Sequence, residues 1–386
     1  MPTSLRSQNR DTRANGRRAS GDLVVLSHLR WDFVWQRPQH LISRMASSAE
    51  RTWFIEEPVA VPDVRAPRLR TSEAGPVVRV WLEVPGDAAH LGFGDAADVY
   101  ADAVAGLLGR APQRIAWLYS PMALPLAEAL EPELVVFDVM DDLASFAHAP
   151  ELLRTRHAET LERADVVFTG GRSLQQLVTG RRPDAHCFPS GVEPEHYARA
   201  RRFRKSRVRP VAGYVGVIDE RLDLDLVASL AQELPDWDIH MVGPVLKIDA
   251  AALPAAPNLH YPGPQQYQDL PRILGGFDVA LMPFALNDAT RCISPTKTLE
   301  YLAAGLPVVS TRVPDVVSEF GAVVELGDDG QFFAEASRRL LAQPAAERER
   351  KVRPLLSWNH WDTIADRMRL LLDGARSAPR PSEQTA

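Results

Sequence analysis

The sequence predicts an α/β protein with two domains in tandem, each built on a parallel sheet. Short apolar runs rich in valine, isoleucine and leucine alternate with amphipathic segments along most of the chain, which is the pattern of β–α–β units. A basic stretch without strand character at 199–209 divides this alternation into two halves. The length of 386 residues is also more than one ordinary core accommodates.

Composition narrows the function classes. Hydrophobic residues make up 45% and charged residues 24%, as in soluble globular proteins, and a net charge of −6 gives no reason to expect a nucleic-acid partner. The cysteines, Cys187 and Cys292, lack metal-ligand spacing, so we expect a reducing compartment such as the cytoplasm and no zinc site. No apolar run approaches the roughly 20 residues that span a bilayer, and no secretory signal is expected.

Domain boundaries follow the changes in composition. The N-terminal tail carries five arginines among small polar residues, and disorder is favoured over an electrostatic tether to an anionic membrane. The charges of the linker are interpreted as those of a solvated connector. The predicted units are a disordered basic tail (1–20), an N-terminal Rossmann-like domain (21–198), a linker (199–209), a C-terminal Rossmann-like domain (210–355), a C-terminal helix (356–374) and a disordered tail (375–386).

Strands and helices alternate in both halves. In the first half, strands are predicted at 22–27, 52–55, 77–82, 115–119, 134–138, 164–169 and 187–190, with helices beginning near Pro38, Asp95, Pro150 and Ser173. In the second half, strands are predicted at 210–217, 237–242, 278–283, 308–309 and 323–325, with a short one ending at Tyr261, and helices at 224–234, near Pro271 and at 332–341. Two such sheets place the loops at their carboxyl edges across a cleft, which suits two ligands that meet between the domains.

A further short helix is predicted after residue 294. Ser294 is a good N-cap, and Pro295 suits the first helical position. Thr296 and Lys297 then lie in the first turn, where free N–H groups and the helix dipole favour an anion. With Glu300 one turn on, the segment predicts a site for a phosphate and a sugar hydroxyl. The alternative, an i,i+3 ion pair between Lys297 and Glu300 on a helix surface, is less favoured.

A second candidate phosphate contact follows the first strand of the second half. Gly216 allows close backbone approach, and Arg221 could neutralise a phosphate; the alternative is an ordinary turn with a helix-surface arginine. Gly213 and Gly216 do not form a dinucleotide fingerprint. In addition, 242–244 reads Val-Gly-Pro where a Rossmann dehydrogenase carries an acidic residue.

The candidate acceptor site lies in the first half. Trp31, Trp35 and Arg37 follow the first strand closely, and the two indoles either pack under the loop or form a stacking platform for a sugar or lipid-linked acceptor. His28 is either a satisfied loop histidine or a hydrogen-bond partner of a sugar hydroxyl.

Three carboxylates, Asp138, Asp141 and Asp142, collect at another strand end. Helix capping or solvation is the favoured reading, and the alternative is to bind or deprotonate the acceptor hydroxyl. No Asp-x-Asp pair has a metal-site context, so no metal is expected.

At this point the residues resemble a known family. The segment 294–309 resembles the donor-site motif of family 4 (group 1) retaining glycosyltransferases of GT-B fold. Residues 31–41, 137–142 and 164–173 are similar to a subgroup of bacterial surface-polysaccharide glycosyltransferases. The similarity spans about 23–374, and it implies two Rossmann-like domains facing across a cleft, with a C-terminal helix that crosses back to the first domain.

The resemblance also implies roles for residues of the donor site. Glu300 corresponds to the second glutamate of the family's Glu-x7-Glu pattern and would hydrogen-bond the ribose, while Ser294, Thr296 and Lys297 would hold the diphosphate. Arg221 matches the phosphate arginine, and Gly243 would lie beneath the base. The chain departs from the pattern at the first glutamate, where it has Cys292.

The implied reaction is transfer of a sugar from a nucleotide-sugar to an acceptor hydroxyl with retention, in cell-surface polysaccharide or glycolipid assembly. Asp141 and His28 are the candidate catalytic residues, and Trp31, Trp35, Arg37 and Asp138 the candidate acceptor contacts. No cofactor or metal is expected, and the enzyme would work in the cytoplasm or at the inner membrane face. The alternatives are a nucleotide-sugar epimerase of the same fold, a non-catalytic nucleotide-sugar-binding protein and, more weakly, a dinucleotide-dependent oxidoreductase.

Overall fold

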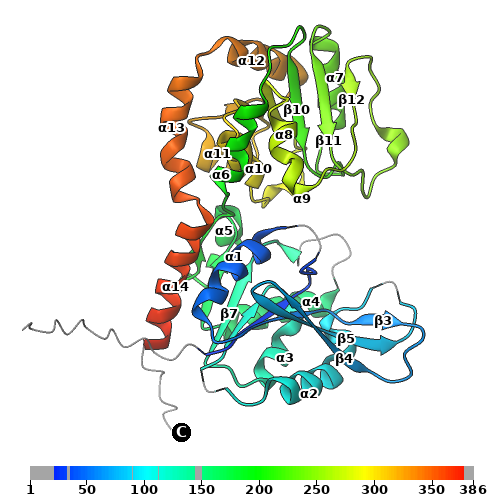
Figure 1. Ribbon diagram of the computed structural model, residues 1–386, viewed down its shortest axis with the longest axis vertical. Coiled ribbons are helices and arrows are strands. Elements are labelled where there is room, and N and C mark those ends of the chain that lie inside the picture. The colour runs from blue at the N-terminus through cyan, green and yellow to red at the C-terminus, as the bar shows by residue number, and fades with distance from the viewer. Residues whose placement is uncertain (1–20, 33–34, 89, 112, 144–149, 378–386) are drawn as a thin grey trace, which may run out of the picture.

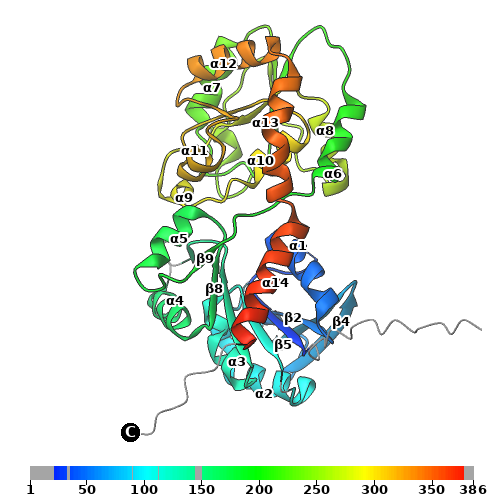
Figure 2. The same cartoon turned by 90° about the vertical axis from the view of Figure 1, so that its left-hand side faces the viewer.

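The computed structural model describes residues 21–377 except 33–34, 89, 112 and 144–149. Two α/β domains lie one above the other in Figure 1, and two successive helices, α13 (Ala345–Trp358) and α14 (Trp361–Ser377), run along one side of both (Figures 1 and 2). This confirms the predicted fold class. The predicted tail at 1–20 and residues 378–386 of the predicted tail at 375–386 lie outside the described residues. Residues 375–377 belong to α14, which extends past the predicted helix end at 374.

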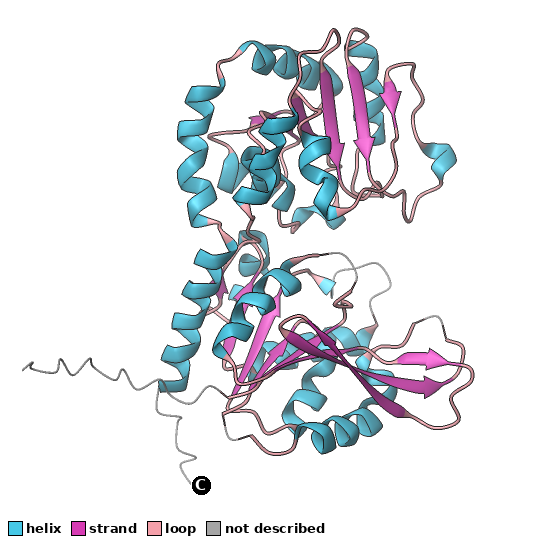
Figure 3. Cartoon of the chain, viewed as in Figure 1, coloured by secondary structure: helices cyan, strands magenta, loops and turns pink. Residues whose placement is uncertain are grey.

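The N-terminal domain contains a nine-stranded sheet of order β3-β5-β2-β1-β6-β7-β8-β9, with β4 paired to β5. Every pairing among its described strands is parallel except β4 with β5. Figure 3 shows the strands of both domains in magenta and the helices around them in cyan. Its strands are β1 (Leu23–Ser27), β2 (Thr52–Glu56), β3 (Val59–Val61), β4 (Arg68–Ala74), β5 (Val77–Pro85), β6 (Ile115–Leu118), β7 (Leu134–Val139), β8 (Val166–Thr169) and β9 (His186–Cys187). Its helices are α1 (Arg37–Met45), α2 (Ala97–Leu108), α3 (Leu124–Ala129), α4 (Glu151–Arg163) and α5 (Arg172–Thr179).

The C-terminal domain contains a parallel sheet of order β12-β11-β10-β13-β14-β15. Its strands are β10 (Val211–Val215), β11 (Asp238–Val242), β12 (Leu259–His260), β13 (Val279–Met282), β14 (Val308–Ser310) and β15 (Glu325–Leu326). The helices on and beside it are α6 (Pro194–Ala198), α7 (Leu224–Glu233), α8 (Leu270–Leu274), α9 (Asp288–Arg291), α10 (Thr296–Ala303), α11 (Pro314–Phe320) and α12 (Gly330–Ala342). Short 3-10 turns occur at η1 (Ala46–Ser48), η2 (Phe93–Ala96), η3 (Pro121–Ala123), η5 (Arg199–Phe203), η6 (Ala250–Ala252) and η7 (Tyr267–Asp269).

Alternation along β1 sorts the N-terminal core into two layers. Val24 and Leu26 face one layer, which α2 to α5 cover, while Leu23 and Val25 face the other layer, which contains α1 and α14. The C-terminal helix α14 therefore completes the N-terminal domain. Among the described residues, no helix is long and apolar enough to cross a bilayer.

Residues 201–209 of the basic stretch are exposed, but several of its arginines also contact the second domain. Arg201 and Arg204 donate to the carbonyl oxygens of Ala303 (3.3 Å) and Gly305 (2.8 Å) at the end of α10, where the helix leaves unpaired acceptors and a partial negative charge. Ala200 lies in the C-terminal core. The arginines of this stretch thus fasten it to the second domain.

A carboxylate of one domain caps a helix of the other. Asp315, in the first turn of α11, is 2% exposed and accepts hydrogen bonds from the backbone N–H (3.0 Å) and the hydroxyl (2.5 Å) of Ser173 in α5. Gly171 makes room for it, because a Cβ there would stand 2.4 Å from Asp315 Oδ2. Arg172 pairs with Glu319 beside it.

We predict that Asp315→Ala lowers the free energy of unfolding by about 1–2 kcal/mol, the usual value of a helix cap, and widens the spacing of the domains. Denaturant unfolding and small-angle scattering measure the two effects. Asp329→Ala is the matched control, because Asp329 caps α12 within one domain by accepting from Phe332 N–H (2.8 Å). Equal scattering curves for the two variants would contradict a cross-domain role.

Candidate active site

Helix α10 begins one residue later than the sequence predicted. Pro295 occupies the N-cap position, and no side chain caps the helix. The Ser294 carbonyl instead accepts from Thr296 N–H at 2.9 Å, and the Ser294 hydroxyl accepts from the backbone N–H of Ser190 at 3.4 Å, across the joint between the domains. The prediction of Ser294 as N-cap is wrong, and the first turn of α10 has no side-chain cap to compete with an anion.

Lys297 and Glu300 form the ion pair that the sequence left as the alternative. Lys297 Nζ lies 2.8 Å from Glu300 Oε2, and both side chains keep some exposure. Burial, and after it the negative charge of the Glu300 carboxylate, raises the pKa of the Tyr197 hydroxyl. Because both members of the Lys297–Glu300 pair stay partly open to solvent, the ion pair does not exclude the ligand role.

The carboxyl ends of β10 and β11 meet at two glycines. Gly216 N–H donates to the Val242 carbonyl at 2.9 Å, and Gly243 adopts a φ of +150°. A Cβ at Gly243 would stand 1.8 Å from the Gly216 carbonyl oxygen, so only glycine fits this position. The two glycines therefore allow the strand ends to pack closely, with Gly243 buried and Gly216 partly exposed.

Arg221 is held in place beside these glycines. Its Nε and Nη2 atoms donate to both Asp219 carboxylate oxygens at 2.7–3.1 Å, which raises the pKa of the guanidinium. Ala285 N–H donates to the Arg221 carbonyl at 2.9 Å and ties the loop to the end of β13. A fixed and half-buried guanidinium suits a phosphate better than a free surface arginine does.

Asp141 follows β7 in the N-terminal domain. The residue is exposed, but the protein around its carboxyl desolvates it and raises its pKa to about 6, opposed by the positive charges of Arg221 and Arg37. Arg221 belongs to the other domain, so the structure brings a candidate catalytic residue and a candidate donor contact close enough to interact electrostatically.

His28 follows β1 at the same edge of the N-terminal sheet. Burial lowers its pKa to about 4, against a hydrogen bond with the Tyr119 backbone, so the ring is neutral near pH 7. Its Nδ1 atom is buried and has no partner within the described part of the chain.

The prediction of three acceptor contacts, Arg37, Asp138 and Trp31, is corrected because these side chains are buried. Arg37 and Asp138 are 3% and 0% exposed and form a bidentate ion pair at 2.8–3.1 Å. Arg37 Nη1 also donates to the Phe188 carbonyl at 2.7 Å. Trp31 packs edge-on against Phe54, with ring centroids 5.0 Å apart.

Trp35 is the predicted acceptor residue with a free surface. Its ring is 41% exposed, and its Nε1–H donates to His40 Nδ1 at 3.0 Å. The indole is thus fixed by one edge and offers a face to solvent.

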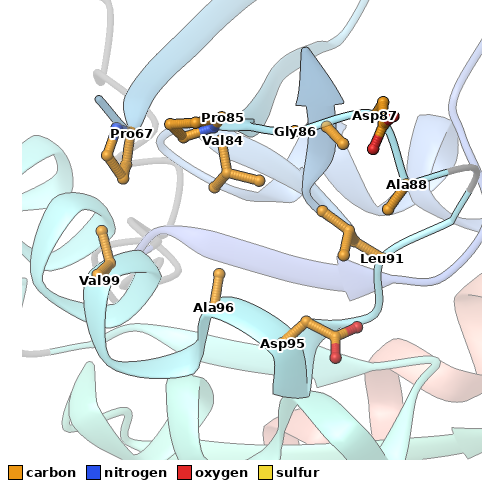
Figure 4. Close-up of a pocket in the computed structure, with 11 residues that line it drawn as sticks. Pro67, Val84, Pro85, Gly86, Asp87, Ala88, Leu91, Asp95, Ala96 and Val99 are labelled. Carbon is orange, nitrogen blue, oxygen red and sulfur yellow. The ribbon is translucent and has the colours of Figure 1, made fainter. Parts of the chain in front are cut away.

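The sequence analysis missed several groups at the edge of the N-terminal domain. Glu57 follows β2, and burial raises its pKa to about 7, with His90 Nε2 3.5 Å from its carboxylate. A pocket of about 420 Å³ opens beyond the end of β5, and Figure 4 shows Val84, Leu91 and Val99 around it with Asp95 on one side. The acidic pair at 56–57, directly after an apolar run, could have identified Glu57 as a candidate from the sequence. Nothing in the sequence indicates the pocket.

Cys292, which stands where the resembled family has a glutamate, packs on the N-terminal core, and burial raises the pKa of its thiol. Among the described residues, no group of three or more His, Cys, Asp or Glu side chains is arranged to hold a metal ion.

Comparison with known proteins agrees with this geometry. Residues 209–343 match the family model of group 1 glycosyl transferases. The Bacillus subtilis protein TuaH is 27% identical to this chain over 222 residues. Its name describes it as a putative glycosyltransferase of teichuronic acid biosynthesis. The match covers 53% of this chain and 55% of that protein, so the chain spans about half the length of this curated relative.

Solved structures share the whole fold. An Escherichia coli trehalose-6-phosphate protein bound with UDP-2-fluoro glucose is similar with a TM-score of 0.68 and 14% identity, over 93% of this chain and 99% of that one. The α,α-trehalose 6-phosphate synthase of Burkholderia multivorans gives a TM-score of 0.65 at 16% identity, over 94% and 100% of the two chains. A glycosyltransferase of Rickettsia africae gives 0.64 at 10% identity, over 93% and 100%.

We predict a pH signature for Asp141. Because its pKa in the folded chain is raised, the stability linked to its protonation is fully present below about pH 4 and is lost as the pH rises through about 6. Asp141→Asn should therefore raise the melting temperature at about pH 7.5, with a gain that shrinks toward zero near pH 4. Melting curves across this range test it, and a gain independent of pH would contradict the raised pKa.

Proposed function

We propose that the protein transfers a sugar from a nucleotide-sugar donor to an acceptor hydroxyl, with retention of anomeric configuration. The match of residues 209–343 to the group 1 glycosyl transferase model and the GT-B fold support this proposal. The observation that carries this proposal is the uncapped first turn of α10, with Lys297 and Glu300 oriented beside it. A nucleoside diphosphate carries two features that this turn suits, a strong anion and ribose hydroxyls.

The donor would bind along the carboxyl edge of the second sheet. Thr296, Lys297 and the N-terminus of α10 contact the diphosphate from one side, and Arg221 contacts it from the other. Glu300 accepts hydrogen bonds from the ribose, and the base lies near Gly216 and Gly243. Since the negative charge on the leaving diphosphate grows during transfer, prearranged cations and N–H groups lower the barrier. On this proposal no metal is needed to neutralise the leaving group.

Asp141 and His28 would act on the acceptor. A carboxyl with a pKa of about 6 is ionised near neutral pH and basic enough to accept a proton from a sugar hydroxyl. The neutral His28 ring, with its buried and unpartnered Nδ1, can hydrogen-bond a second hydroxyl. The exposed face of Trp35 supplies an apolar surface for the sugar ring.

The acceptor is proposed to be a sugar or lipid-linked intermediate of cell-surface polysaccharide or glycolipid assembly, used at the cytoplasmic face of the membrane. The similarity to TuaH supports the polysaccharide class.

We predict that Lys297→Ala and Glu300→Ala each weaken the binding of a nucleoside diphosphate by at least about tenfold, because each removes a charge-assisted hydrogen bond. Calorimetry with UDP, GDP and dTDP measures this, after a thermal-shift screen has identified the base. Lys351→Ala is the control, because it breaks a comparable helix-surface pair with Glu347 (3.1 Å) away from the cleft. Unchanged affinity in both site variants would rule out the proposed donor site.

A further inference from the structure

A buried carboxylate occupies one edge of the Arg221 guanidinium. Asp219 is 3% exposed, and its oxygens accept from Arg221 Nε at 2.9 and 3.1 Å and from Nη2 at 2.7 Å. Asp219 Oδ1 also accepts from the Arg221 backbone N–H at 3.1 Å. A guanidinium can donate in pairs from two of its edges, so Asp219 takes the edge with Nε and leaves the edge with Nη1. In the part of the chain that the structure describes, no acceptor contacts Nη1.

The loop that carries this pair, between β10 and α7, is fastened on both sides. On the side of β11, Ile218 N–H donates to the Pro244 carbonyl at 2.9 Å, and Leu246 N–H donates to the Ile218 carbonyl at 3.0 Å. On the side of β13, Asp223 N–H donates to the Pro283 carbonyl at 2.9 Å. The backbone of the loop is therefore held between the segments that follow two strands of the sheet.

Asn287 connects the same loop to the segment that leads into α10. Its Nδ2 atom donates to the Glu220 carbonyl at 3.2 Å, one residue before Arg221. Its Oδ1 atom accepts from Thr290 N–H at 3.2 Å and caps α9. Residues 292–295 alone separate α9 from α10. The two proposed phosphate contacts, Arg221 and the first turn of α10, are thus joined through one short segment.

We propose that Asp219 and Asn287 are positioning residues that hold Arg221 with its Nη1 edge free for the donor diphosphate. This inference rests on the proposed role of Arg221 in donor binding. Asp219 fixes the plane of the guanidinium through a bidentate contact, and Asn287 holds the backbone from which the side chain extends. A side chain that is already ordered loses less conformational entropy when the ligand binds.

Removal of the Asp219 charge has opposite expected effects under positioning and under simple electrostatics. Asp219 places a negative charge next to a cation that would contact phosphate, so Coulomb's law alone predicts tighter anion binding without it. If Asp219 positions Arg221, its loss weakens binding instead, because the ligand must then order the released side chain. The sign of the change in affinity distinguishes the two cases.

The first test is Asp219→Asn in the full chain, with calorimetry of UDP, GDP and dTDP. The substitution keeps the shape of the side chain but removes its charge, and it should weaken nucleotide binding by about tenfold. Combined with Arg221→Ala it should weaken binding no further, because Asp219 acts through Arg221. Asp238→Asn is the matched control: it removes a carboxylate that pairs with Arg209 Nε at 3.1 Å, at the start of β11, and its affinity should equal that of the wild type.

The second test is Asn287→Ser, measured in the same way. Serine keeps a neutral N-cap for α9, but its side chain is too short to reach the Glu220 carbonyl. Nucleotide binding should therefore weaken by about threefold, as expected for one neutral hydrogen bond. Melting curves establish that each variant is folded.

Unchanged or tighter binding by Asp219→Asn, or an effect that adds fully to that of Arg221→Ala, would overturn the role of Asp219. Unchanged binding by Asn287→Ser would overturn the role of Asn287. If Arg221→Ala itself binds as the wild type does, Arg221 is not a donor contact and this inference falls with it. Failure of the wild-type chain to bind any of the three nucleotides would instead overturn the proposed donor site as a whole.

Discussion

The packing of α14 on the N-terminal sheet is the contact on which the rest of the structure depends. Trp361, at the start of this helix, is 2% exposed and lies in the core layer that contains β1 and α1. Gly191 leaves the space it needs, since a Cβ there would stand 2.9 Å from the indole. Because α13 contacts α10 of the other domain, one pair of helices sets the relation between two sheets that share no strand (Figure 2).

The arrangement of the two domains also determines which charged groups face each other between them. The carboxyl edges of both sheets must face each other for Arg221 to act on Asp141, and the contacts around the joint maintain this arrangement. Asp315 caps α5 from the second domain, and Glu193 is shared between Arg44 and Tyr267. A ligand held between the edges would meet fixed positive charge on one side and an acceptor carboxylate on the other.

The fold could be predicted from the sequence because buried parallel strands are continuous apolar runs, which can be recognised without knowing which distant residues they contact. The exceptions have physical reasons. Strand β4 is largely exposed and therefore lacks an apolar run, and β3 has only three residues, which are partly exposed. The arginines of 199–209 have the composition of a connector, and only the folded chain brings the end of α10 within their reach.

The donor side and the acceptor side of the site also differ in whether local sequence predicts their contacts. Lys297 and Glu300 are three residues apart on one helix, so their proximity was predictable. Arg37 and Asp138 are 101 residues apart, and each separately reads as a polar group at a strand end. Nothing local in the sequence shows that they neutralise each other inside the protein. Similarly, Ser294 has the residue type of an N-cap, but the approach of Ser190 from the first domain draws its hydroxyl away from the helix.

Hydrogen–deuterium exchange of the full chain, with and without a bound nucleoside diphosphate, tests the central claim most directly. The account predicts protection of the backbone at 216–221, 243 and 294–300. Protection confined to other regions, or binding that leaves 294–300 unprotected, would contradict the assignment of α10 as the start of the donor site.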